Sequence, residues 1–336
     1  METNNQGRIS KVKIATVFGG SGFVGRHVVG LLAKDGYQIR VAVRRPDLAF
    51  HLQPLGNVGQ IQAVQANLRF GWSVERAVEG SDVVINLVGI LAESGKQHFE
   101  DVHVEGAGLI AQECKKRKIP LVHVSALGAD PESSSAYYSS KARAEQLVRK
   151  TLKSAIILRP SIIFGSEDNF FNKFAEMAAI SPFLPVIGGG KTLFQPIYVG
   201  DVAKAVVLGA KGALVAGKTY ELGGTETLTF RQCVEQVLRY TGRNNSVISI
   251  PWSLAALMAK LTGWMPGAPL TRDQVEMLKT DSVVSKNAIR QKLTLSAMGI
   301  EAKTLASILP TYMMRFRVHG QYSKTLLSEA QDRSST

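Results

Sequence analysis

The first half of the 336-residue chain alternates short apolar runs with longer segments of mixed polarity. Runs that are apolar on both faces are typical of buried strands, and the segments between them predict helices. Such an alternation indicates α/β architecture with a doubly wound parallel sheet covered by helices on both faces. The expected strands are 14–18, 38–43, 60–65, 82–88, 121–124 and 155–158, and the expected helices include 72–78, 99–116 and 138–152.

The pattern loosens after residue 159. Residues 181–190 are rich in Pro and Gly and predict a loop, Thr229 is the expected N-cap of a helix, and Asp201 is expected to cap a helix that starts near Val202. We therefore expect a dinucleotide-binding domain over 1–165, with return segments near 191–222. A smaller, mixed region for substrate or interaction follows over 166–326, and 327–336 forms a disordered tail. The remaining expected elements are helices at 170–179, 202–208 and 229–240 and a strand at 219–222.

A glycine cluster joins the first expected strand to the first helix. Gly20, Gly22 and Gly25 fit the spacing G-x-G-x-x-G, while Gly19, Gly22 and Gly25 fit G-x-x-G-x-x-G. Either spacing, placed between a strand and a helix, predicts a Rossmann-like dinucleotide cradle. The backbone N–H groups that open the helix, together with the helix dipole, favour a pyrophosphate there.

Composition narrows the range of functions. The hydrophobic fraction of 45% is sufficient for a sizeable core, and the formal net charge is +13. The two cysteines, Cys114 and Cys233, predict buried thiols, no metal-binding spacing occurs, and no nucleic-acid-binding motif accompanies the charge. His123 lies within an apolar strand and is interpreted as a core histidine.

Two features point to nicotinamide chemistry. Tyr137 and Lys141 form a Y-x-x-x-K spacing at the start of an expected helix. One helical turn separates them, so an ammonium near the phenol would lower its pKa and allow proton exchange with a carbonyl or alcohol. Arg44 and Arg45 follow the second strand, where an acid would favour NAD and an arginine accommodates a 2′-phosphate. We therefore expect NADP(H) in preference to NAD(H).

Four ordered motifs carry a family resemblance: VFGGSGFVGR, SSSAYYSSKARAE, RPSIIFGSEDNFFNKFA and QPIYVGDV. They resemble the extended and atypical branches of the short-chain dehydrogenase/reductase superfamily. Within it, they are similar to the 39 kDa accessory-subunit family of respiratory complex I.

This resemblance implies roles for individual residues. Tyr137 would be the general acid/base and Lys141 would hold the nicotinamide ribose. The family usually places a Ser hydroxyl at the end of the strand before the Tyr. Ala126 stands there, and a shift of one residue would give that role to Ser125. The resemblance also implies a pyrophosphate site at Gly19, Gly22, Phe23, Val24 and Gly25, an adenosine side at Asn86, Val88 and Gly89, and a nicotinamide end bordered by Arg159, Pro160 and Ile162.

The resemblance favours a protein that holds a dinucleotide in a mainly structural or regulatory role linked to the respiratory chain or quinone metabolism. The alternative is an active NADP-dependent oxidoreductase on an apolar, quinone- or lipid-like substrate. A second alternative, a sugar-nucleotide epimerase or dehydratase, follows only from the extended branch.

The segment 252–264 is almost wholly apolar and too short to span a bilayer. It predicts either a buried helix or a helix that lies against a membrane or a hydrophobic partner. The stretch 302–328 is basic and contains no acid, which suits anionic lipid. The polar N-terminus predicts no secretory signal. We expect a cytoplasmic protein, peripheral on the inner face of the cytoplasmic membrane, whose partner is respiratory complex I or an anionic membrane surface.

Overall fold

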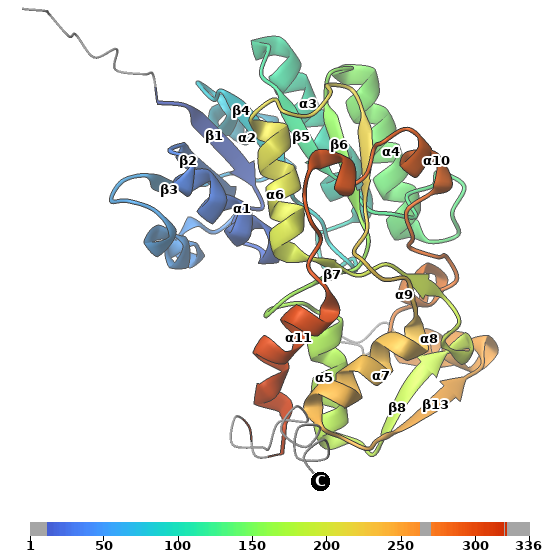
Figure 1. Cartoon of the computed structure of the whole chain (residues 1–336). Helices are drawn as coiled ribbons and strands as arrows, with labels where there is room; N and C mark the ends of the chain where they lie inside the picture. Colours follow the sequence, from blue (N-terminus) through green and yellow to red (C-terminus); the bar gives the residue numbers. More distant parts are fainter. Residues whose placement is uncertain (1–11, 263–269, 319, 321–336) are drawn as a thin grey trace, which may run out of the picture. The chain divides into compact units, whose positions relative to one another are not determined.

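The computed structural model describes residues 12–262, 270–318 and 320 (Figure 1). Contacts between Cα atoms divide the chain into two compact units that interleave along the sequence. The first unit comprises 1–124, 143–158 and 203–218, and the second comprises 125–142, 159–202 and 219–336. The domain boundary expected at residue 165 stays a prediction, and the tail expected at 327–336 lies outside the described residues.

The main sheet has seven strands in the order β11-β6-β5-β4-β1-β2-β3 (Figure 1). The pairs from β3 to β6 in that order are all parallel. Since β1 lies between β2 and β4, the winding changes direction at β1, where open α/β sheets bind ligands at the carboxyl ends of their strands. This order confirms the predicted doubly wound, Rossmann-like class. The strands are β1 Ile14–Phe18, β2 Gln38–Val43, β3 Ile61–Gln65, β4 Val83–Asn86, β5 Leu121–Val124, β6 Ile156–Pro160 and β11 Thr219–Leu222.

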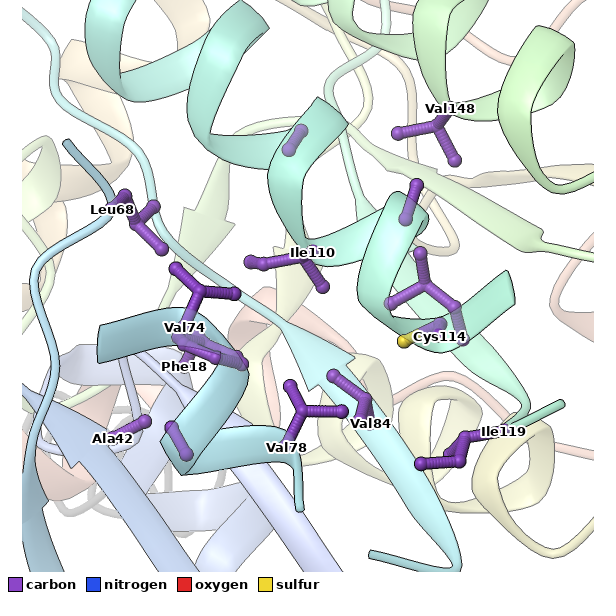
Figure 2. Packing of buried hydrophobic residues seen from close by; sticks show 14 of the residues in the cluster. Phe18, Ala42, Leu68, Val74, Val78, Val84, Ile110, Cys114, Ile119 and Val148 are labelled. Carbon is purple, nitrogen blue, oxygen red and sulfur yellow. The ribbon is translucent and has the colours of Figure 1, made fainter. Parts of the chain in front are cut away.

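Helices α2 and α3 bury their apolar faces in the first unit. Val74 and Val78 of α2 pack in one cluster with Ile110 and Cys114 of α3 and with Val84 of β4 (Figure 2). Burial raises the pKa of the Cys114 thiol to about 12, so it is an inert core thiol as expected. The helices of this region are α1 Phe23–Lys34, α2 Gly71–Val78 and α3 Gly106–Arg117, while α4 Ala136–Thr151 and α6 Val199–Ala210 each have residues in both units.

Two expected elements near β4 have different bounds in the structure. The strand expected over 82–88 ends at Asn86, because the Asn86 side-chain oxygen accepts the Val88 N–H at 3.0 Å and turns the chain. The helix expected over 99–116 begins with a π-helical segment, Glu100–Glu105, before α3. That segment carries His103, whose Nε2 accepts the Ile90 N–H at 3.0 Å. Asn86 and His103 thus both bind backbone N–H groups of the loop after β4.

The second unit has a separate core that is rich in aromatic rings. Phe170 and Phe230 contact each other, and each also contacts Phe174 and Phe194, with ring centroids 5.3–6.2 Å apart. Its further elements are β7 Ile163–Phe164 paired with β10 Ile197–Tyr198, β9 Leu193–Phe194 paired with β12 Leu228–Thr229, α5 Phe171–Ile180, α7 Phe230–Thr241, α9 Arg272–Met277, α10 Lys286–Arg290 and α11 Leu305–Met313.

The prediction of a loop over 181–190 is wrong for its central residues. Residues Phe183–Ile187 form β8, which pairs in parallel with β13, Ser246–Ile250. The sequence did not predict this strand because it contains Pro185, and proline is unusual within a strand. In a sheet of two strands each strand has an unpaired edge, where a residue without an N–H is tolerated.

Two helix starts test the capping predictions. Thr229 caps α7 and forms a capping box with Gln232, as expected. The cap predicted at Asp201 is wrong, because α6 already begins at Val199. Asp201 lies in the first turn, fully buried, and its carboxylate accepts the Lys303 N–H at 2.7 Å. It therefore joins α6 to the segment before α11.

Helix α8, Trp252–Thr262, is formed by the apolar segment and is buried on one side and exposed on the other. Ala255 and Ala259 are buried in a cluster with Val275 of α9. The exposed side carries what we name the α8 apolar face: Leu254, Leu257, Met258 and Leu261, which are 47%, 52%, 42% and 64% exposed. Trp264 lies outside the described residues.

Trp252, the first residue of α8, belongs to the internal packing of this unit. Its indole occupies the space into which a Cβ on Gly188 would project. It packs against the cluster that holds Ala255 and Ala259. Within the described ranges, no helix has the length and hydropathy that crossing a membrane requires.

The basic residues near the chain's end also have internal contacts. Arg315 donates to the Ser166 carbonyl and to Asn172 Oδ1, and Arg317 donates to the Tyr240 carbonyl. These arginines were expected to serve a membrane surface, and the structure gives them a role in holding the second unit together. Lys324 lies outside the described residues.

Candidate dinucleotide site

The glycine turn leaves the start of α1 open. Gly19 has φ +76° and donates its N–H to the Ala42 carbonyl at 3.3 Å. Gly22 precedes α1 as its N-cap without a side-chain cap, and the Arg26 N–H makes the first helical bond, to the Gly22 carbonyl. The N–H groups of Phe23, Val24 and Gly25 therefore have no acceptor within the helix. Three such donors at a helix N-terminus suit a phosphate group.

The glycines of the turn are needed for different physical reasons. A Cβ on Gly25 would overlap the Gly19 carbonyl oxygen and lie 2.6 Å from the Gly20 carbonyl carbon. A Cβ on Gly22 would find its nearest neighbour, the Gly19 oxygen, at 3.4 Å, which is ordinary contact. Gly25 thus permits close packing of α1, whereas Gly22 is exposed and leaves the approach to the helix N-terminus clear. A pyrophosphate would fit this cradle.

The loops beside the turn come from β2 and β4. Phe18 is paired with Ala42 on one side and with Asn86 on the other. A Cβ on Gly19 would lie 3.2 Å from the Val88 nitrogen, so the loop that contains Val88 and Gly89 borders the turn directly. Asn86, expected to line the adenosine side, is itself buried. Its amide lies 3.1 Å from Nδ1 of His123, which is the core histidine predicted.

Arg44 and Arg45 directly follow β2, and both are exposed. The Arg45 guanidinium pairs with Asp47 at 2.6 Å. This hydrogen bond holds the pKa of the Asp47 carboxyl below its ordinary value. Asp47 is the first acid after β2, and it pairs with Arg45. Its charge therefore does not neutralise both arginines.

Tyr137 and Lys141 lie in the first turns of α4, one helical turn apart, as the spacing predicts. Lys141 is 4% exposed, and Tyr137 is half-buried. Burial raises the pKa of the Tyr137 phenol above its ordinary value, and the neighbouring Tyr138 phenol and the Asp273 carboxylate raise it further. This direction is opposite to the one a general base requires.

Ser125 follows the end of β5 and is 4% exposed. Its hydroxyl oxygen has no hydrogen-bond partner among the residues that the structure describes. Buried polar atoms are normally paired, so an orphan hydroxyl suggests a ligand. Ala126 comes next, half-buried and without a hydroxyl.

The segment after β6 lies beside the Ser125 loop. The Pro160 carbonyl accepts the Leu127 N–H at 2.9 Å. The Ile162 carbonyl accepts the Ile197 N–H at 2.9 Å, which fixes the strand that follows. Pro160 is buried, and Arg159 and Ile162 are half-buried. The predicted site residues are divided between the two units. The first unit contains the glycine turn, Arg44, Arg45 and the Asn86–Gly89 loop. The second contains Ser125, Tyr137, Lys141, Arg159, Pro160 and Ile162.

One contributor was missed by the sequence reasoning. Asp273 of α9 accepts hydrogen bonds from the backbone of Ala136 and Tyr137. It lies 136 positions from Tyr137, and no motif marks it. Within the described ranges, no cluster of three or more His, Cys, Asp or Glu side chains could hold a metal ion.

Comparison with known proteins identifies the family. Residues 15–223 match the model of the NAD dependent epimerase/dehydratase family, which is more than half of the chain. The chain belongs to this family. The matched region begins within β1 and includes the glycine turn and α1.

Relatives extend the similarity beyond the family region. The chain is 36% identical over 290 residues to the Arabidopsis thaliana protein NADH dehydrogenase [ubiquinone] 1 alpha subcomplex subunit 9, mitochondrial, covering 82% of this chain and 72% of the relative. It is 31% identical over 335 residues to the Neurospora crassa NADH-ubiquinone oxidoreductase 40 kDa subunit, mitochondrial, covering 98% and 87%. These names agree with the complex I resemblance of the sequence.

Solved structures of other proteins share the fold. The dTDP-glucose 4,6-dehydratase of Bacillus anthracis, solved in complex with NAD, superimposes with a TM-score of 0.68 at 18% identity. The match covers 90% of this chain and 96% of that one. At this identity the likeness shows the fold alone.

Two single substitutions test the glycine turn. Gly25→Ala should lower the free energy of unfolding by about 1–3 kcal/mol, because its Cβ would overlap backbone atoms. Gly22→Ala should cost less than about 1 kcal/mol of stability, yet weaken NADPH binding by about tenfold or more, since the methyl group would stand where a phosphate approaches. Urea unfolding and calorimetric titration measure the two quantities. Unchanged NADPH affinity in Gly22→Ala would exclude the turn as the phosphate site.

Proposed function

We propose that the chain is an accessory protein of respiratory complex I that holds NADP(H) in a mainly structural or regulatory role. The observation that carries this proposal is the open N-terminus of α1 behind the glycine turn, in a chain related over most of its length to complex I subunits. Bound dinucleotide would stabilise the fold by mass action.

The family resemblance assigns dinucleotide-binding roles to residues within each unit. The N–H groups of Phe23, Val24 and Gly25 would bind the pyrophosphate, and Val88 and Gly89 would border the adenosine. Tyr137, Lys141, Arg159, Pro160 and Ile162 would receive the nicotinamide end. A bound nicotinamide would supply hydride chemistry. Ala126 has no hydroxyl at the position where the family usually has a Ser to bind the reacting oxygen. Such a donor is worth roughly 10²–10³ in rate, so the structural role is favoured over turnover.

A second candidate, an NADP-dependent oxidoreductase on an apolar substrate, is favoured by one observation. The orphan hydroxyl of Ser125 supplies a buried donor next to the usual position. With Tyr137 as the proton donor and Lys141 beside it, these residues would make the set needed to protonate a carbonyl oxygen. The sugar-nucleotide alternative has support only at the level of the fold.

Turnover separates the two candidates. In a broad reductase screen with NADPH, the unmodified protein should show a rate far below about 10 per second, a typical enzyme value. Ala126→Ser should raise any detectable rate and Tyr137→Phe should abolish it. Tyr138→Phe is the matched control, since that buried phenol packs against Gly128. If the unmodified protein turns over at a rate near this typical enzyme value, it is an oxidoreductase and the mainly structural role is wrong.

Arg44 and Arg45 should set the nucleotide preference. Replacing Arg44 by Ala should weaken NADPH binding by roughly 10–100-fold, the loss of one or two hydrogen bonds to a charged phosphate. NADH binding should change little. Arg45→Ala should have a smaller effect, because Arg45 is paired with Asp47. Calorimetric titration of both nucleotides measures this, with the exposed Arg290→Ala as the control for net charge. Equal losses for NADPH and NADH would contradict a 2′-phosphate site.

We propose that the chain also associates peripherally with the inner face of the cytoplasmic membrane through the α8 apolar face. Leu254, Leu257, Met258 and Leu261 recur at helical spacing on one side of α8. Each would contribute up to roughly 1.5–3 kcal/mol when fully buried. Lys260 would add about 1 kcal/mol near anionic lipid.

Sedimentation with anionic liposomes tests this surface. The unmodified protein should sediment at low salt and less at high salt, and Leu257→Glu with Leu261→Glu should abolish sedimentation. The matched control places two glutamates at Leu48 and Val58, which are 65% and 107% exposed in the first unit. If the unmodified protein stays in the supernatant, lipid docking is wrong. Co-purification with complex I, compared between the same variants, then shows whether a protein partner uses the face.

A further inference from the structure

The C-terminal halves of α3 and α4 lie side by side in the first unit. Helix α3 leads from β4 to β5 and α4 leads from β5 to β6, so both run in the same direction along the parallel sheet. Val148 of α4 packs in one cluster with Ile110 and Cys114 of α3 (Figure 2). The helices approach closely at Gly108, where a Cβ would lie 2.5 Å from Leu147 Cδ2. Leu147 also lines a groove of about 570 Å³ between them.

The two walls of this groove are built with the same spacing. Residues at positions i, i+3 and i+4 of a helix share one face. Each helix contributes three residues with this spacing to the groove, and three of the six are exposed lysines. The residues are Gln112, Lys115 and Lys116 from α3, and Leu147, Lys150 and Thr151 from α4.

The positive charge at these helix ends exceeds what the helices themselves require. All four residues at 115–118 are basic, as are three of the five at 149–153. A cation in the last turn of a helix is favoured by the helix dipole, but the C-terminus of a helix carries only about half an elementary negative charge. The two dipoles therefore offset only a small part of this charge.

The acids beside α3 are already engaged. Glu75 pairs with both Lys116 and Arg117. Glu113 pairs with Arg117. Within the described ranges, the other two lysines that line the groove form no ion pair with an acid. The groove is therefore left with uncompensated positive charge on each of its walls.

Two possible occupants suit this groove poorly. A helix that docks on a lipid surface presents apolar side chains to the bilayer. Of the exposed large apolar residues in the part of the chain that the structure describes, none lies in 106–117 or 143–151. A second copy of the chain would bring lysines against lysines across a symmetric interface, and each copy carries a formal net charge of +13. Both arguments leave an anionic protein segment as the occupant.

We propose that the groove between α3 and α4 is a docking site for an acidic segment of a partner protein. Carboxylates of that segment would pair with Lys115 and Lys150 on opposite walls, and an apolar side chain between them would contact Leu147. The groove shares no residue with the dinucleotide site or with the α8 apolar face. The proposal therefore stands independently of the proposed function.

The probe for this site is a short fluorescent peptide of glutamate and leucine residues, and its twin has glutamine in place of every glutamate. Fluorescence anisotropy measures the affinity of both for the full chain. The acidic peptide should bind, more weakly at high salt because salt screens exposed charges, and its twin should not bind. Lys115→Gln with Lys150→Gln should weaken binding by about three- to tenfold, as expected for the loss of two exposed ion pairs.

Lys34→Gln with Lys96→Gln is the matched control. Both lysines are exposed in the first unit, and Lys34, like Lys115, lies in the last turn of its helix. The control and the groove variant have the same net charge, so the comparison separates a local site from general attraction. Equal affinities of the two variants for the acidic peptide would overturn the proposal. Failure of the unmodified protein to bind that peptide would overturn it as well.

Sedimentation with phosphatidylglycerol vesicles tests the lipid alternative on the same proteins. The groove variant should sediment to the same extent as the control variant, because the α8 apolar face is intact in both. If the groove variant loses a sedimentation that the control variant keeps, the groove is a lipid site and the proposal is wrong. Neither measurement uses nucleotide, so titration of NADPH tests the proposed function separately.

Discussion

The nucleotide-binding end of the first unit depends on how closely α1 approaches the turn before it. No side chain fits at Gly25, because the backbone of Gly19 and Gly20 already occupies that space. This contact sets where α1 begins and therefore where its unbonded N–H groups lie. The positive φ of Gly19 brings the same turn against the loop after β4. Gly25 thus determines where the donors lie, and Gly19 determines which loop borders them.

The sequence predicted features that are encoded locally. The strand 38–43 matched β2 to the residue, because apolar side chains on both faces mark a buried parallel strand. Thr229 was found as a cap because Ser, Thr, Asp and Asn favour that position for a chemical reason. The helical position of Tyr137 and Lys141 followed from their spacing.

Features that depend on distant residues were missed. Strand β8 contains Pro185, which suggests a loop unless the partner strand β13 is known. Asp201 resembles a cap by sequence, yet its carboxylate binds a backbone group 102 positions away. Asp273 reaches α4 from a helix of six residues, too short for any periodic signal. In each case the deciding contact is between segments far apart in the chain, which a local pattern does not encode.

The interleaving of the two units constrains how the protein is made. The first unit takes its last segment from residues 203–218, while the second already claims 125–142 and 159–202. On the ribosome, therefore, the first unit stays incomplete until residue 218 has been synthesised. Neither unit is one continuous stretch of chain, so a fragment that ends before residue 218 leaves both units incomplete. Two segments of the second unit, 125–142 and 159–202, are therefore made before the first unit can complete its fold.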